Sequence, residues 1–269
     1  NKVVAMAFTL RPWRHWKEDR MTPKPLRSAA ALAALTCAAL PLAAQDAVHE
    51  WGDRSAPGFA PAWPTQTRAP LTRSRAEPQM DTIARGLEHP WAVADLPEGG
   101  FLVTERPGRL RRVTMDGEIS DPIGGLPEVE NRPQEQGGTP QGGLLDIKLG
   151  PDFSETRHVY FTYAKPVEGD LSATAAARGR LSDDMTEVED VEDLWVQDPA
   201  SPARMHYGSR IVFDGEGHAF INTGEPFTRT ERQFAQDLDS TYGKVVRVNL
   251  DGSVPGDNPY AGRERALGE

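Results

Sequence analysis

The sequence predicts an all-β protein built from repeated units of short antiparallel strands, and three observations lead to that prediction. The 269 residues include 25 Gly and 23 Pro, a turn-rich composition that favours many short elements over long helices. Runs rich in Val, Ile, Phe and Tyr have the apolar character of strands. A strand–turn–strand pattern also recurs at a spacing of roughly 55–65 residues, a period typical of repeat folds.

Three segments carry this pattern: "WAVADLPEGGFLVTE" at 91–105, "GLLDIKLGPDFSETRHVYFTYA" at 143–164 and "SRIVFDGEGHAFINTG" at 209–224. The turns "LPEGG", "LGPDF" and "FDGEG" occupy the same place in each segment. A third strand follows in two of the units, at 108–119 and 243–254, where a "DG" pair marks a hairpin turn.

Antiparallel strands that repeat at this period predict a β-propeller of four-stranded blades, in which neighbouring blades cover each other's apolar faces. The acidic segment 183–198 has interleaved apolar residues and is expected to be the outer strand of a blade plus a solvated loop. About three blades are visible, too few to close a ring. Residues 81–269 are therefore expected to form the N-terminal half of a larger propeller. The alternative, an open sandwich, does not explain the recurring turn.

Residues 21–44 have the pattern of a secretory signal peptide, with a start at Met21, a basic region, an apolar stretch and a cleavage site after Ala44. The alternative, a membrane anchor, needs a longer apolar span. Residues 1–20 resemble translated upstream sequence, and the Pro/Ala-rich segment 45–80 predicts a loosely packed lead-in. The mature chain is thus expected to be periplasmic or secreted, with no transmembrane span.

The acidic balance of the chain argues against nucleic acid as a partner. The formal net charge is −10, and segment 1–44 carries seven Lys/Arg against two Asp/Glu, so its removal leaves about −15. Binding to phosphates requires clustered Lys and Arg. The single cysteine, Cys37, lies in the signal segment, so the mature chain is expected to contain no disulfide.

Two segments are placed where the loops of a propeller converge on its central channel. In "QEQGGTPQGGLLD" at 134–146, glycines would let a flat ligand approach the backbone, and Gln141 offers a donor and an acceptor. The alternative is a flexible loop without a ligand. In the other segment, His206 precedes a strand, and Glu225 follows the strand that returns to the same end.

A carboxylate that accepts from one imidazole nitrogen fixes the tautomer and raises the basicity of the other nitrogen. His206 and Glu225 are therefore candidates for a general base and its partner. The alternative is a loop histidine beside a solvated carboxylate. The sequence has no G-x-G-x-x-G or P-loop motif, no zinc-ligand spacing, no G-x-S-x-G around Ser209 and no calcium-loop spacing in 183–198.

Four motifs resemble the soluble glucose/sorbosone dehydrogenases, which are aldose sugar dehydrogenases dependent on pyrroloquinoline quinone (PQQ). They keep the family's order over about residues 81–260 and read "HPWAVADLPEGGFLVTERPGRL", "QGGLLDIKLGPDF", "HYGSRIVFDGEGHAFINTGE" and "AQDLDSTYGKVVRVNLDGSVPGDNP". The resemblance implies a six-bladed propeller that oxidises an aldose and passes electrons to an external acceptor. It also implies that Gln141 contacts PQQ and that Arg210 either belongs to the cofactor site or braces the strand end.

The resemblance implies that His206 takes the proton of the sugar's anomeric hydroxyl while hydride passes to the quinone. Glu225 stands where the family has Asp; its side chain is one methylene longer and Pro226 follows, so the His–carboxylate geometry is an open question. The family's calcium ligands and the cations that hold the quinone carboxylates are expected beyond residue 269, so the chain alone is expected to be inactive.

Two other functions compete with this expectation. One is a non-catalytic propeller that binds sugars or proteins. The other is a propeller lactonase, which would need several metal-binding carboxylates in the channel, where only Glu105 and Glu225 are suitably placed.

Overall fold

The computed structural model describes residues 58, 60, 76, 78–134 and 137–259. The strands belong to one compact unit that includes Met80–Glu269. The predicted signal peptide and nearly all of the predicted lead-in lie outside the described residues. No helix in the described part of the chain is long and apolar enough to cross a membrane.

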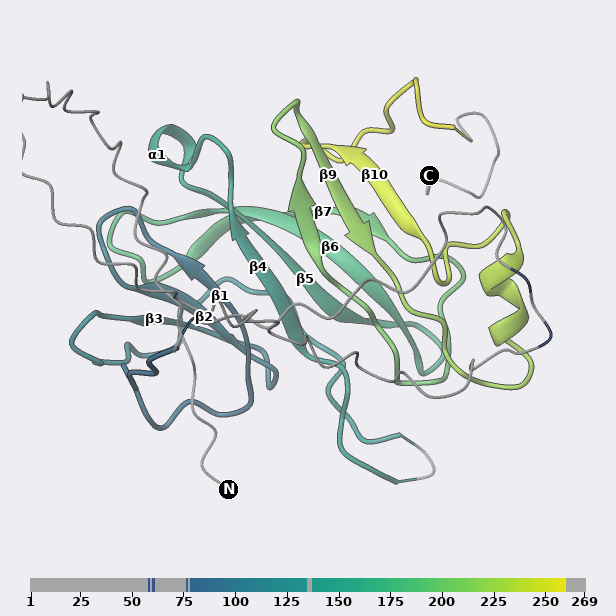
Figure 1. Cartoon of the computed structure of the whole chain (residues 1–269), viewed down its shortest axis with the longest axis horizontal. Helices are drawn as coiled ribbons and strands as arrows, with labels where there is room; N and C mark the ends of the chain where they lie inside the picture. The colour runs from purple at the N-terminus through teal and green to yellow at the C-terminus, as the bar shows by residue number, and fades with distance from the viewer. Residues whose placement is uncertain (1–57, 59, 61–75, 77, 135–136, 260–269) are drawn as a thin grey trace, which may run out of the picture. The chain divides into compact units, whose positions relative to one another are not determined.

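The described residues form three antiparallel sheets (Figure 1). The first sheet has the order β1-β2-β3, with bounds Pro90–Asp95, Phe101–Glu105 and Arg109–Val113. The second has the order β4-β5-β6-β7, with bounds Leu144–Leu149, His158–Val167, Leu171–Leu181 and Val188–Val196. The third has the order β10-β9-β8, with bounds Val245–Asn249, His218–Asn222 and Ile211–Phe213. Two short helices, α1 (Phe153–Thr156) and η1 (Arg232–Gln236), lie in connections.

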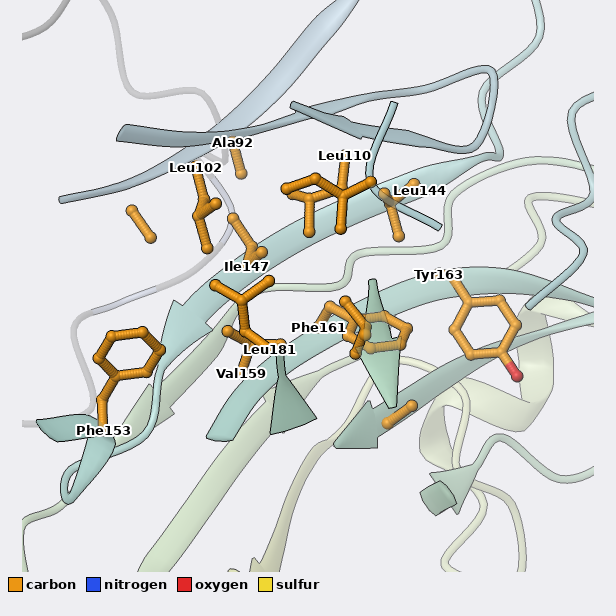
Figure 2. Close-up of a cluster of buried hydrophobic side chains, with 14 of the residues drawn as sticks. Ala92, Leu102, Leu110, Leu144, Ile147, Phe153, Val159, Phe161, Tyr163 and Leu181 are labelled. Atoms are coloured by element: carbon orange, nitrogen blue, oxygen red, sulfur yellow. The ribbon is translucent and has the colours of Figure 1, made fainter. Parts of the chain in front are cut away.

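The second sheet lies between the other two and is covered on both faces (Figure 1). Successive residues of a strand point to opposite faces. Phe161 on β5 packs with Leu102 and Ile147 in the core shared with the first sheet, as Figure 2 shows. Its neighbour Tyr160 packs with Ile211 in the core shared with the third sheet. Burial on both faces explains the almost continuous apolar run of β5.

The expected all-β organisation with three units is confirmed, but four strands are described in the second sheet alone. There the acidic segment forms the edge strand β7, as predicted. In the first sheet, residues 119–123 approach the outer strand β3 but make two isolated bridges instead of a ladder. Pro122 within this segment has no N–H to donate, which limits regular pairing.

The internal repeat extends to the hydrogen bonds between sheets. In the first sheet, the Thr104 hydroxyl accepts the Ala92 N–H at 3.0 Å and donates to the Leu145 carbonyl of β4 at 2.6 Å. In the second sheet, the Thr162 hydroxyl accepts the Asp146 N–H at 3.0 Å. It then donates to the Ser209 carbonyl, just before β8, at 2.7 Å. A threonine hydroxyl of one sheet thus bonds to the first strand of the next sheet, β4, and to the residue that precedes β8.

Candidate functional site

A pocket of about 660 Å³ opens where the first strands of the three sheets begin. Its wall includes Trp91 on β1, Leu145 on β4, and the segment that leads into β8. Two of the four predicted site residues, Gln141 and His206, line it, whereas Glu225 and Arg210 do not. A concave site at the ends of several strands is a common place for ligand binding.

The glycines of the predicted loop have two different roles. A Cβ at Gly142 would collide with the carbonyl oxygen of Glu130, and one at Gly143 would collide with that of Arg106. Gly143 also has φ +122, which side chains rarely adopt. Close packing of backbone therefore requires these two glycines. Gly138, in contrast, lines the pocket and has open space around it, so the approach of a flat ligand there stays a prediction.

His206 is held in a backbone conformation that non-glycine residues seldom adopt, with φ 57. Ser209 also has a positive φ, 92, so the residues just before β8 cannot form a regular strand. The His206 N–H donates to Gln141 Oε1 at 3.0 Å, and the hydroxyl of Thr174 donates to the Tyr207 carbonyl at 2.7 Å. Such conformations persist where the surroundings over-determine them, and they concentrate at functional sites.

The ring of His206 has a defined hydrogen bond. Nδ1 lies 3.0 Å from the carbonyl oxygen of Glu225. Because a carbonyl oxygen only accepts, Nδ1 carries a proton in this contact, and in the neutral tautomer Nε2 is the nitrogen with the lone pair. The ring of Phe227 lies 5.3 Å away, centroid to centroid. His206 is otherwise exposed, so Nε2 can act as a base toward a ligand in the pocket.

His206 and Glu225 are neighbours, as expected. The predicted contact between the Glu225 carboxylate and the imidazole is wrong, because the main-chain carbonyl of Glu225 contacts the ring instead. The carboxylate instead accepts the Phe227 N–H at 2.8 Å, through Oε2. Pro226 has no N–H, so the nearest free amide after Glu225 is that of Phe227. The Glu225 side chain thus bonds to this amide, and the Glu225 main-chain carbonyl orients His206.

Arg210 braces the start of β8, which is one of the two roles that the sequence left open. Its Nη1 lies 2.8 Å from Asp146 Oδ1, and Asp146 Oδ2 accepts the Ile211 N–H at 2.9 Å. Asp146 is 1% exposed. Sequence reasoning missed this carboxylate, although an acid within the apolar run "LLDIKL" was a usable signal, because buried charges are almost always paired.

Arg106 is a second residue that the sequence analysis passed over. Its guanidinium lies over the Trp91 ring, 5.8 Å from the centroid, and Nη1 donates to the Pro140 carbonyl. Both side chains line the pocket beside Gln141. The usable signal was the motif "ERPGR", which follows β2 at the end of the sheet where β1 begins.

A cluster of charged and polar side chains around the buried Glu130 lies next to the His206 segment. Glu130 is 3% exposed, and its carboxylate pairs with Arg132 and lies 3.4 Å from Arg204 Nε. Burial by itself raises the pKa of Glu130, but the hydrogen bonds from Arg132 outweigh it and hold that pKa below its ordinary value. Tyr207 is buried beside it, and burial raises its pKa to about 12.

The described residues contain no group of three or more His, Cys, Asp or Glu side chains arranged to hold a metal ion. The pocket wall also contains no Asp or Glu among these residues, while it includes one guanidinium and one imidazole.

Comparisons with known proteins show the family of the chain. The family model described as Glucose / Sorbosone dehydrogenase matches residues 87–269. The chain is similar to the aldose sugar dehydrogenase YliI of Escherichia coli (strain K12), with 38% identity over 200 residues, which cover 74% of this chain and 51% of that protein.

Two solved structures show the same likeness. One is the soluble aldose sugar dehydrogenase of Escherichia coli in its apo-form, with 40% identity, a TM-score of 0.60, and coverage of 67% of this chain and 49% of that one. The other is the PQQ-bound aldose sugar dehydrogenase of Streptomyces coelicolor, with 27% identity, a TM-score of 0.56, and coverage of 68% and 51%. The chain thus spans about half the length of the relatives it matches, and it belongs to the glucose/sorbosone dehydrogenase family.

Proposed function

We propose that this chain is the N-terminal half of a periplasmic quinoprotein that oxidises the C1 hydroxyl of aldose sugars to the lactone. The observation that carries the proposal is the His206 ring, oriented through Nδ1 by the Glu225 carbonyl, with Nε2 free at the pocket. A quinone dehydrogenase needs a base of this kind beside its cofactor. The relatives described as aldose sugar dehydrogenases support the substrate class.

The three sheets correspond, in this proposal, to three blades of a six-bladed propeller. Their repeated inter-sheet hydrogen bonds support a ring of equivalent blades, because a threonine of the preceding sheet bonds to β4 and to the start of β8. The coverage of about half of each relative agrees with this number of blades. The signal peptide at 21–44 stays a prediction and supports export to the periplasm.

The pocket residues fit PQQ, a flat quinone with three carboxylates. The absence of Asp and Glu from the described pocket wall avoids repulsion, and Gly138 leaves room for a planar ring. A relative of known structure binds PQQ. When bound, PQQ supplies the acceptor for the hydride equivalent of the sugar. Calcium is part of the proposal, with ligands expected beyond residue 269.

The roles of this chain's residues follow from their contacts. His206 Nε2 takes the proton of the sugar's C1 hydroxyl, while Nδ1–H remains bonded to the Glu225 carbonyl. Gln141 Oε1 accepts the His206 N–H, so its amide nitrogen stays free to donate to the ligand. Gln141 thus orients both the base and the cofactor. Arg210 acts through Asp146 as a brace and not through the ligand.

Replacing the proposed base tests this function in the full-length enzyme. His206→Ala is expected to lower kcat by about 10²–10⁴-fold, the usual contribution of a general base, with Kd for PQQ nearly unchanged. Steady-state dye reduction with glucose measures the rate, and titration of PQQ measures the affinity.

His218→Ala is the matched control, because His218 pairs with Asp214 and does not line the pocket. It should keep the normal rate. Near-normal turnover in His206→Ala would remove the base assignment. An unmodified enzyme that binds sugars but neither binds PQQ nor reduces dye would instead favour a non-catalytic binding propeller.

A further inference from the structure

Arg106 presents its guanidinium at the wall of the pocket, where it has no carboxylate partner among the residues that the structure describes. No Asp or Glu oxygen among the described residues lies within 4 Å of it, whereas many arginines of this acidic chain are paired. Paired examples are Arg109, Arg111, Arg132, Arg178, Arg180 and Arg210. Among the described residues, the pocket wall thus presents a cation without a carboxylate neighbour, which creates a local positive potential in a chain of net charge −10.

The backbone of Arg106 is fixed on both sides. Its N–H donates to the His89 carbonyl at 3.1 Å, and its carbonyl accepts the Leu144 N–H at 3.1 Å. The second bond ties Arg106 to the strand that carries the Gln141 loop. The close approach of Gly143 to the Arg106 carbonyl makes the same connection. Arg106 thus has a fixed position relative to the predicted cofactor residue.

The side chain of Arg106 is oriented as well. The guanidinium lies over the Trp91 ring, and Nη1 donates to the Pro140 carbonyl. Contact with an aromatic face occupies the face of a guanidinium and leaves its in-plane N–H donors available. A pre-oriented guanidinium loses little conformational entropy when it binds a carboxylate, and its fork geometry suits two parallel hydrogen bonds.

We propose that Arg106 binds a carboxylate of the cofactor in this pocket, with Trp91 holding the guanidinium in place. This inference rests on the proposed function, because it takes PQQ as the ligand. It also revises the expectation that the cations for the quinone carboxylates all lie beyond residue 269. The first sheet then contributes to the cofactor site together with the second sheet and the segment that leads into β8.

A purely structural role for Arg106 makes a different prediction, and the charge of the ligand separates the two. As a latch on Pro140, Arg106 would support binding of any ligand that fits the pocket. As a carboxylate-binding residue, it would discriminate PQQ from the PQQ trimethyl ester, which keeps the ring system but lacks the three negative charges.

The experiment titrates the full-length apoenzyme with PQQ and, separately, with its trimethyl ester, and measures Kd by absorbance and tryptophan fluorescence. Arg106→Gln is expected to weaken PQQ binding by about 10–100-fold, the effect of losing a charge-assisted hydrogen bond. Its Kd for the ester should equal that of the unmodified protein. Arg106→Lys should restore part of the PQQ affinity, because it keeps the charge without the fork.

Arg180→Gln is the matched control, since it removes the same charge from a surface site where Arg180 pairs with Asp183 and Glu189. It should leave both Kd values unchanged. Equal loss of PQQ and ester affinity in Arg106→Gln would show a latch and overturn the inference, as would an unchanged PQQ affinity. In both cases the proposed function survives if the unmodified enzyme binds PQQ and reduces dye; failure of the unmodified enzyme to bind PQQ overturns both.

Discussion

The contact between the first and second sheets differs from the contact between the second and third sheets. Both use a threonine hydroxyl that bonds to the next inner strand. The first contact is otherwise dominated by packed aliphatic and aromatic side chains, among them Leu102, Leu110 and Phe161 (Figure 2). The second contact adds a buried carboxylate, Asp146, that holds both the Arg210 side chain and the Ile211 amide.

Equivalent positions of the repeat explain this difference. Ala92 and Asp146 both donate their N–H groups to the threonine of their own sheet, so they occupy the same place in successive units. In the first unit the side chain is a methyl group. In the second it is a carboxylate that reaches β8. Strand β8 is short and follows residues with positive φ. Its few ladder hydrogen bonds are therefore supplemented by the bonds to Asp146.

The largest expected loss of stability is at the contact between the first and second sheets. Leu102→Ala should lower the free energy of unfolding by about 2–5 kcal/mol, because Leu102 is fully buried and its truncation leaves a cavity. Urea unfolding of the chain followed by circular dichroism measures the loss. Val245→Ala, at a position 67% exposed, is the control and should change stability little. A loss below that of the control would contradict the role of this core.

An intermediate loss of stability is expected at the contact between the second and third sheets. Asp146→Ala should cost about 1–3 kcal/mol, because the buried Ile211 N–H loses its acceptor. The same urea titration measures this loss. Asp257→Ala removes an exposed carboxylate that pairs with Arg247, and it should cost less than about 1 kcal/mol. If Asp146→Ala lowered the free energy of unfolding no more than Asp257→Ala, the Asp146 hydrogen bonds would not stabilise the contact between the second and third sheets.

The smallest expected effect is a pH dependence under the His206 segment. The pKa of Glu130 is lowered in the folded protein, so its stabilising contribution is present above the ordinary carboxyl pKa and is lost as pH falls through the folded value. The melting temperature should therefore fall between about pH 5 and pH 3, and Glu130→Gln should lose less over this range. Identical pH profiles for the two proteins would show that Glu130 does not contribute.

Much of the fold was predictable because strand period and turn residues are local properties. The repeat of strand, turn and strand, and the outer position of β7, were read directly from 91–105, 143–164, 209–224 and 183–198. The missing regular fourth strand in the first sheet was not anticipated, although Pro122 was a visible reason for it. Such exceptions depend on how many hydrogen bonds a segment can make with a partner strand.

Less of the candidate site was predictable. The hairpin between β8 and β9 was enough to bring His206 and Glu225 together, and the segments of Gln141 and His206 converge on one pocket as expected. The atom of Glu225 that contacts His206 depends on which nearby amide the carboxylate binds, so it was missed. Asp146 and Arg106 were missed because their partners are distant in the sequence.

The sequence by itself determined the β class, the three units and the family, because periodicity, turn chemistry and motif order are encoded in short stretches. Only the tertiary structure decided that a carbonyl orients the His206 ring, that Asp146 links two sheets, and that Arg106 lines the pocket and bonds to the Pro140 carbonyl. These features join residues 19, 64 and 34 positions apart, respectively, for Glu225–His206, Asp146–Arg210 and Arg106–Pro140. Their geometry exists only once the sheets have packed together.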